Sequence, residues 1–480
     1  MSHSALGAPH APEHDHGRPA ADRRRWVVLT LLCLGQFMLI LDVTVVNVAL
    51  PDIAADLHLD RATLTWVVTS YTLCFGGLML LGGRLADTFG ARRTLLTGLT
   101  VFTAASLTAA LAGGAGVLLG ARMAQGVGAA LLSPSALALV TTTFHGPERA
   151  KALGVWAGIG GTGSAVGVLL GGALTSGPGW SWIFYVNVPV GVLILALLPR
   201  LVPAGPRRPA PLDIPGALLV TAGTAGLIYG LVKAGDAGWG APATLLPLAG
   251  AALCYAGFAV VERAGRAPLM DVTMLTRRPV LGGALLMLVA TALLISAFFL
   301  GSVYLQHVRG FSAVRTGLVF LPVAIGTGIG AHLASRLLGH LGGRTTAVAG
   351  MAVAAAGIAP LGGLDGGTGV YSVLMPCLAV AAFGLGAVLV TAVTMAMAMV
   401  EPGESGLASA VVNTFHEVGG SVGVAVVSTV AAGGIEAGVP GGFGRAFVVA
   451  AVAAGVAAVL AVGLVPSDRP QIVGGPHGAH

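Results

Sequence analysis

Residues 83–94 read GRLADTFGARRT, and residues 335–346 read SRLLGHLGGRTT. Aligned without gaps, the two stretches share Arg, Leu, Gly, Arg and Thr at matching places. Each joins two long apolar segments, so the pair indicates an internal repeat. A weaker echo pairs GSAVGV at 163–168 with GGSVGV at 419–424. Chance similarity between Gly- and Leu-rich segments is the alternative explanation.

The composition of the chain requires a lipid environment. Of its 480 residues, 55% are hydrophobic and 9% are charged, with a mean hydropathy of +0.89. Soluble domains carry about 25% charged residues. The 74 glycines agree with this, because small residues let helices approach closely within a bilayer. We therefore expect an all-α integral membrane protein.

The apolar segments set the number of membrane spans. A transmembrane helix needs about 20 mostly apolar residues. By that length the chain holds fourteen candidates, at residues 26–50, 64–83, 94–112, 116–140, 152–174, 181–199, 213–232, 243–261, 280–303, 315–335, 345–361, 370–399, 406–432 and 443–465. In both repeated pairs the second copy lies eight spans after the first, so the simplest layout is two six-span halves with two spans inserted between them.

This layout divides the chain into five parts. We expect a disordered cytoplasmic tail, an N-terminal six-helix bundle, a linker with two inserted transmembrane helices, a C-terminal six-helix bundle and a second cytoplasmic tail, at residues 1–25, 26–200, 201–279, 280–466 and 467–480. Repeated halves with a site between them are a common architecture of secondary transporters.

The basic residues predict the orientation of the spans. With both termini inside, 19 of the 25 Arg and Lys residues lie in cytoplasmic segments and five in outer loops, while Arg122 lies within a span. Cytoplasmic loops of membrane proteins carry this excess. We therefore expect a multi-pass protein of a bacterial cell (inner) membrane with both termini in the cytoplasm. The net charge of +6 then reflects topology and not nucleic-acid binding.

Several stretches resemble signatures of a transporter family. The loop at 83–93 resembles the signature between spans 2 and 3 of the major facilitator superfamily, and RMAQGVG at 122–128 is similar to its fourth-span motif. LDVTVVNVALP at 41–51 and WIFYVNVPVG at 182–191 resemble motifs of the fourteen-span drug:proton antiporter branch (EmrB/QacA type). GSAVGVLLGG at 163–172 is close to the antiporter motif, although Val168 stands where the family has proline.

The resemblance implies roles for two groups of residues. The conformational latch comprises Gly83, Asp87, Gly90, Arg92 and Arg93. Asp87 can pair with one of the arginines and lie against a helix N-terminus, which would stabilise one of two packings; ordinary loop charges are the alternative. The antiporter-motif helix carries Gly163, Gly167, Gly171 and Gly172. Val168 does not break the helix as proline does, so the kink of the motif is not expected.

Two charges within the spans lie at similar depth. Asp42 is eight residues from the outer end of its span, or about 12 Å, and Arg122 is six residues from the outer end of its own, or about 9 Å. A nearby cation favours the ionised carboxylate, and burial favours the protonated one. The resemblance places their two spans side by side along the cavity, so we expect a pair whose change in separation would load and unload a proton. A static ion pair that fixes packing is the alternative.

A second acidic group lies near the bilayer midplane. Glu417 falls eleven residues into its span and follows His416, where the family often has a polar or acidic pair. The carboxylate suits a cationic substrate or a second proton, which His416 could share. Hydrogen bonds to neighbouring helices are the alternative role.

The sequence predicts a function without an enzymatic site. It contains no phosphate-binding loop, HExxH, GxSxG or paired CxxC sequence, so we expect no catalytic residues, metal or cofactor. We expect a proton-gradient-driven secondary transporter that exports drugs or small hydrophobic metabolites by alternating access. Its expected partners are a lipophilic small molecule, protons and lipid, with no nucleic acid, and it is expected to be a monomer. Proton-coupled uptake and a non-transporting membrane sensor remain as alternatives.

Overall fold

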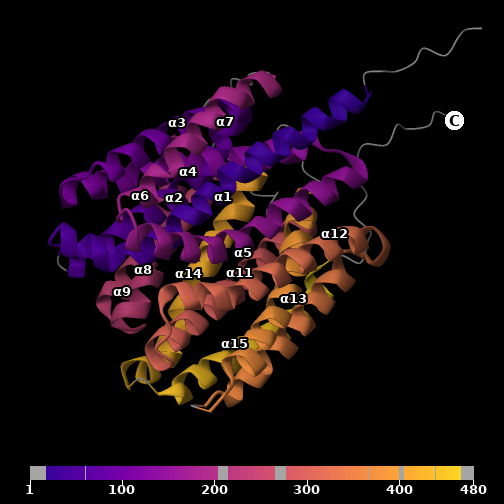
Figure 1. Cartoon of the computed structure of the whole chain (residues 1–480). Helices are drawn as coiled ribbons and strands as arrows, with labels where there is room; N and C mark the ends of the chain where they lie inside the picture. Colours follow the sequence, from indigo (N-terminus) through magenta and orange to yellow (C-terminus); the bar gives the residue numbers. More distant parts are fainter. Residues whose placement is uncertain are drawn as a thin grey trace, which may run out of the picture.

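The structure of the chain, a computed structural model, describes residues 18–59, 61–203, 214–264, 277–365, 367–398, 405–437 and 439–465. These residues form helices joined by short turns, with no strand among them (Figure 1). The tails predicted at 1–25 and 467–480 lie mostly or wholly outside the described residues. The predicted domain boundaries stay predictions.

The helices follow one another with few residues between them. In chain order they are α1 (Arg18–Asp56), α2 (Arg61–Phe89), α3 (Ala91–Ala110), α4 (Ala115–Thr143), α5 (Gly146–Ser176), α6 (Trp182–Tyr185), α7 (Asn187–Leu201), α8 (Ile214–Ala237), α9 (Pro242–Ala264), α11 (Arg278–Val303), η1 (Tyr304–Val308), α12 (Ala313–Ile358), η2 (Ala359–Gly363), η3 (Val370–Leu374), α13 (Met375–Met397), α14 (Ser405–Ala437) and α15 (Pro440–Leu464). Helices suit lipid because they satisfy every backbone polar group internally.

Eleven segments of the described residues are long and apolar enough to cross a membrane. One of them, Val314–Gly363, contains two predicted spans, because Gly342 (φ 80°, ψ 165°) interrupts α12. The predicted third and fifth spans correspond to α3 and α5, which are helical but are not among the eleven. The fold is all-helical, as predicted, while the exact number of fourteen spans stays a prediction.

The helices before α8 and those after α9 form two groups (Figure 1). In the first group α2 and α3 pack on α4, and α1 packs on α5 and α7. In the second group α11 packs on α13 and α14, and α12 packs on α13 and α15. The two groups meet where α5 packs on α12 and where α2 packs on α14.

Small residues allow α5 and α12 to approach each other closely. A Cβ atom added to Gly154 would lie 2.8 Å from the Cβ of Ser335, and one added to Gly172 would lie 2.9 Å from Val314 Cγ2. These contacts are 18 residues apart on α5, so the close approach extends over most of the helix. We call this α5–α12 interface the glycine seam.

The α2–α14 interface carries an additional helix, α8. A Cβ atom on Gly76 of α2 would overlap Ile228 of α8, and one on Gly77 would lie 3.2 Å from Ala225 Cβ. At the end of α8, the Trp239 indole donates a hydrogen bond of 3.1 Å to Thr429 Oγ1 of α14. Thus α8 packs on both helices of the second interface.

Candidate functional site

An ion pair joins α1 and α4 in the membrane interior. Arg122 Nη1 donates to Asp42 Oδ2 at 2.5 Å, and each residue is only 1% exposed. The similar depth predicted from the sequence therefore corresponds to direct contact. The role of the pair in proton coupling stays a prediction.

Three neutral side chains complete the surroundings of Asp42. Gln125 Nε2 and Asn187 Nδ2 donate to Asp42 Oδ1 at 3.1 and 2.9 Å. Gln125 Nε2 also donates to Ser106 Oγ at 2.8 Å, while its Oε1 accepts from Arg122 Nη1 at 2.9 Å. Because buried polar groups need hydrogen-bond partners, these contacts hold the carboxylate in one orientation.

Arg122 has further partners on α2 and α6. Its Nε donates to the Val67 carbonyl at 3.0 Å, and its guanidinium carbon lies 4.4 Å from the centre of the Tyr71 ring and 6.0 Å from that of Phe184. An aromatic face attracts a cation, more strongly away from water. The polar network therefore joins helices α1, α2, α3, α4, α6 and α7, all in the first group.

Glu417 and His416 lie in the other group, on α14. His416 Nδ1 and Thr291 Oγ1 of α11 share a hydrogen bond of 3.0 Å. The Cβ of Glu417 lies 3.9 Å from where a Cβ on Gly76 of α2 would be, so Glu417 faces the α2–α14 interface. Within the residues that the structure describes, neither residue makes a hydrogen bond or ion pair with Asp42 or Arg122.

Tyr71 lies between the ion pair and Glu417. Its ring is stacked on Arg122, and it is within electrostatic range of both Asp42 and Glu417. Its hydroxyl is buried and makes no hydrogen bond to any residue that the structure describes. The two predicted proton sites are thus separate, and Tyr71 interacts electrostatically with both.

The antiporter-motif glycines face two different helices. A Cβ on Gly163 would lie 2.8 Å from Ile40 Cγ2, one on Gly167 would overlap Thr44 Oγ1, and one on Gly171 would lie 3.2 Å from the Val45 Cα. These three glycines therefore let α5 approach α1 on both sides of Asp42. Gly172 instead faces Val314 of α12, at the glycine seam. The side chain of Val168 lies outside the described part of α5.

The two copies of the repeated loop have the same local structure. Gly90 and Gly342 occupy matching places and both have positive φ, 94° and 80°. Arg92 Nη2 donates to the Pro199 carbonyl near the end of α7, at 3.1 Å, and Arg344 Nε donates to the Val465 carbonyl just after α15, at 2.7 Å. In both copies a threonine hydroxyl, from Thr94 or Thr346, donates to the carbonyl of that glycine.

This arrangement fixes the end of the last helix in each half. Glycine is needed at the turn because other residues avoid positive φ. Arg92, one of the two arginines that could pair with Asp87, binds a backbone carbonyl of α7. Asp87, Gly83 and Arg93 lie at the same helix–turn–helix corner, and their function as a latch stays a prediction.

Sequence reasoning missed Gln125, Asn187, Ser106 and Tyr71 as site residues. Gln125 lies three residues after Arg122 on one helix, which places the two side chains on the same face. Asn187 lies within the motif at 182–191. Those two signals were available, whereas no sequence pattern connects Ser106 or Tyr71 with Asp42.

The sequence profile of the Major Facilitator Superfamily matches residues 32–424 and 323–479. The chain belongs to the major facilitator superfamily. It is 42% identical to the puromycin resistance protein pur8 of Streptomyces alboniger, over 87% of this chain and 84% of that protein. It is 39% identical to the cephamycin export protein CmcT of Amycolatopsis lactamdurans, over 87% of each.

Solved structures agree on the fold. The human organic anion transporter MFSD10 superimposes with a TM-score of 0.65 at 16% identity, over 92% of this chain and 99% of that one. Membership of this superfamily makes the chain a multi-pass membrane transporter of small molecules and not an enzyme. The predicted resemblance to the family is confirmed, and the resistance and export relatives are consistent with the drug:proton antiporter branch.

Proposed function

We propose that this chain exports lipophilic drugs or small hydrophobic metabolites in exchange for protons, by alternating access. The single observation that carries the proposal is the buried Asp42–Arg122 pair, in a chain whose relatives include resistance and export proteins. The proton gradient drives the cycle, and no cofactor takes part. The protein works as a monomer with substrate, protons and lipid as its partners.

The proposed topology has fourteen spans with both termini in the cytoplasm. The split of 19 against five basic residues supports the orientation. The helical α3 and α5, and the break of α12 at Gly342, support the count. In this orientation the Gly90 and Gly342 corners lie on the cytoplasmic side of a bacterial cell membrane.

Asp42 is the proposed proton carrier. In the described state its carboxylate is held by one cation and two amides, an arrangement that stabilises the ionised form. Movement of α1 relative to α4 would separate Asp42 from Arg122 and leave a buried carboxylate that takes up a proton. The Asn187 Oδ1 is buried and accepts no hydrogen bond from the described residues. Rotation of this amide would present an acceptor to the protonated carboxyl.

Glu417 is the proposed second acidic group. It lies at the interface between the two halves, close to Gly76, where a cationic part of a substrate or a second proton can reach it during rocking. His416 is held by Thr291, so its role is to position the adjacent carboxylate and to share the proton.

The experiment compares wild type with Asp42→Asn in inverted membrane vesicles. We expect substrate-evoked proton release with wild type and none with Asp42→Asn, using a panel of lipophilic antibiotics that includes puromycin. Asp52→Asn is the matched control, because Asp52 is an exposed aspartate near the end of the same helix. Full proton release by Asp42→Asn would refute the proposal, and release in the opposite direction would favour proton-coupled uptake.

A further inference from the structure

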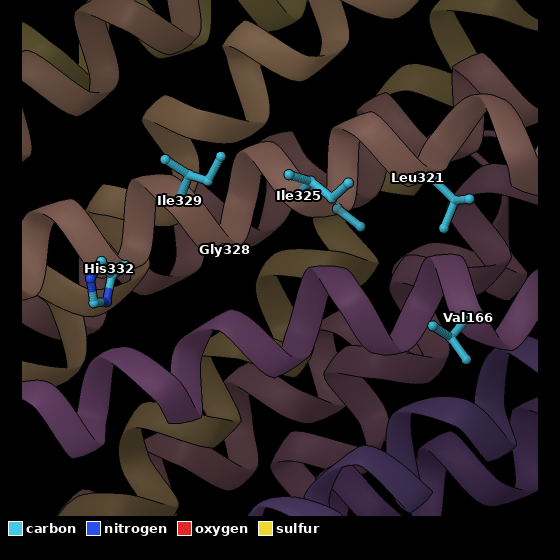
Figure 2. A pocket seen from close by; sticks show the side chains of 7 residues that line it. Val166, Leu321, Ile325, Gly328, Ile329 and His332 are labelled. Atoms are coloured by element: carbon cyan, nitrogen blue, oxygen red, sulfur yellow. The ribbon is translucent and has the colours of Figure 1, made fainter.

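A hollow of about 350 Å³ lies along the glycine seam (Figure 2). Val166 of α5 forms one wall and α12 forms the other, with Leu321, Ala324, Ile325, Gly328, Ile329 and His332. In Figure 2, Val166 stands on one helix opposite Leu321 on the other, and His332 lies at the far end. We call this hollow the seam groove.

The seam groove opens to the outside of the protein. Ile325 is 60% exposed and Ile329 is 55% exposed, although both belong to a helix that crosses the membrane. Close contacts flank the groove along the two helices, since α5 and α12 touch through Gly154 and Ser335 beyond its His332 end and through Gly172 and Val314 beyond its Leu321 end. An apolar, exposed hollow within the bilayer is filled by lipid or by a lipophilic ligand.

Basic side chains gather at one end of the groove. His332 lines it, and Arg336 follows one helical turn later on the same exposed face. Arg336 is six residues, or about 9 Å, before the break at Gly342. Lys151 lies three residues before Gly154, the residue that meets Ser335, and so is at a similar level on α5.

The charges at this end favour an anionic partner. Lys151 is in contact with the Trp26 ring, at 4.9 Å from its centre, and remains exposed. Glu148, the acidic residue nearest to it on α5, is paired with Arg25 at 3.4 Å. Arg336 has no hydrogen bond or ion pair with the described residues. In the orientation proposed above, this end lies at the headgroups of the cytoplasmic leaflet.

We propose that the seam groove binds an anionic phospholipid of the cytoplasmic leaflet. One acyl chain lies along Leu321, Ile325 and Ile329 against Val166, and the phosphate lies at Arg336 and Lys151. Basic pockets between transmembrane helices on this side of a membrane suit such headgroups. At the second interface between the halves, α8 packs on both α2 and α14.

The test uses the full chain, purified and incubated with phosphatidylglycerol that carries a diazirine in its acyl chain. After photolysis, mass spectrometry maps the labelled peptides. We expect labelling of the α5 and α12 peptides that contain Val166 and Ile329, and little labelling from phosphatidylcholine with the same chain. Each surface cation contributes about fivefold to the binding of an anionic lipid.

Two variants distinguish the contribution of the lipid headgroup to binding from that of the acyl chain. The double variant Arg336→Gln/Lys151→Gln should lower phosphatidylglycerol labelling by roughly 25-fold, to the level of phosphatidylcholine. Ile329→Trp fills the groove and should abolish labelling by both lipids. Arg445→Gln and Val459→Trp, which change an exposed cation and an exposed apolar residue of α15, should label like wild type.

Three results would overturn the proposal. One is equal labelling by the two lipids, and another is labelling that persists in Ile329→Trp. The third is phosphatidylglycerol labelling that Arg336→Gln/Lys151→Gln leaves unchanged, which would assign the groove to neutral lipophiles. None of these depends on drug transport, so failure here would leave the proposed export function standing.

Discussion

Replacement of Arg122 by methionine tests how much the buried ion pair with Asp42 contributes to the stability of the protein. The variant leaves Asp42 buried without a cation, and removing one partner of such a pair costs about 3–5 kcal/mol. The amides of Gln125 and Asn187 still bind the carboxylate, at 3.1 and 2.9 Å, which lowers this cost. The lost contact with the Tyr71 ring raises it. We expect a loss of about 4 kcal/mol in unfolding free energy.

The assay is thermal unfolding of the purified protein in detergent at constant pH. The unpaired Asp42 side chain accounts for most of the expected deficit. The double variant Asp42→Asn/Arg122→Met should recover more than half of the loss. Arg445→Met, at an exposed arginine, should change the unfolding free energy by less than about 0.5 kcal/mol. The absence of any recovery in the double variant would refute the reasoning.

Two glycine substitutions test the helix contacts. Gly167→Ala should lower thermal stability and block transport, because the new methyl group would overlap Thr44 on α1, the helix that carries Asp42. The control Gly250→Ala, which has no atom within 4 Å of the new methyl group, should be neutral or stabilising. Equal stability of the two variants would count against the close α1–α5 contact. Gly342→Ala should cost about 1–3 kcal/mol because its φ is 80°, while Gly339→Ala in the preceding helix should not, as differential scanning fluorimetry would measure.

The contact between Asp42 and Arg122 was within reach of the sequence because helical rise is constant. A residue's distance from the end of its span fixes its depth whatever its neighbours are. Two opposite charges buried at the same depth are then expected to form an ion pair, because an unpaired charge in lipid costs several kcal/mol. Gln125 could have been added from its spacing to Arg122. Ser106 and Tyr71 could not, because serine and tyrosine are common in helices and only packing selects these two.

The helix that each motif glycine contacts also could not be predicted from the sequence. Gly171 and Gly172 are adjacent and chemically identical, yet one faces α1 and the other faces α12. A helix turns by about 100° per residue, so neighbouring residues point to different partners. Which partner stands on each side depends on how the bundles assemble.

By itself the sequence determined that the chain lies in a membrane, is helical and carries a duplicated corner. These properties follow from local quantities: hydropathy over about 20 residues, and a glycine and an arginine at fixed spacing. Tertiary structure alone decided that two amides hold Asp42, that α8 packs on both helices of one interface and that a groove lies along the other. Each of these depends on which helices are neighbours, and helices that are apolar on every side carry no local signal of that choice.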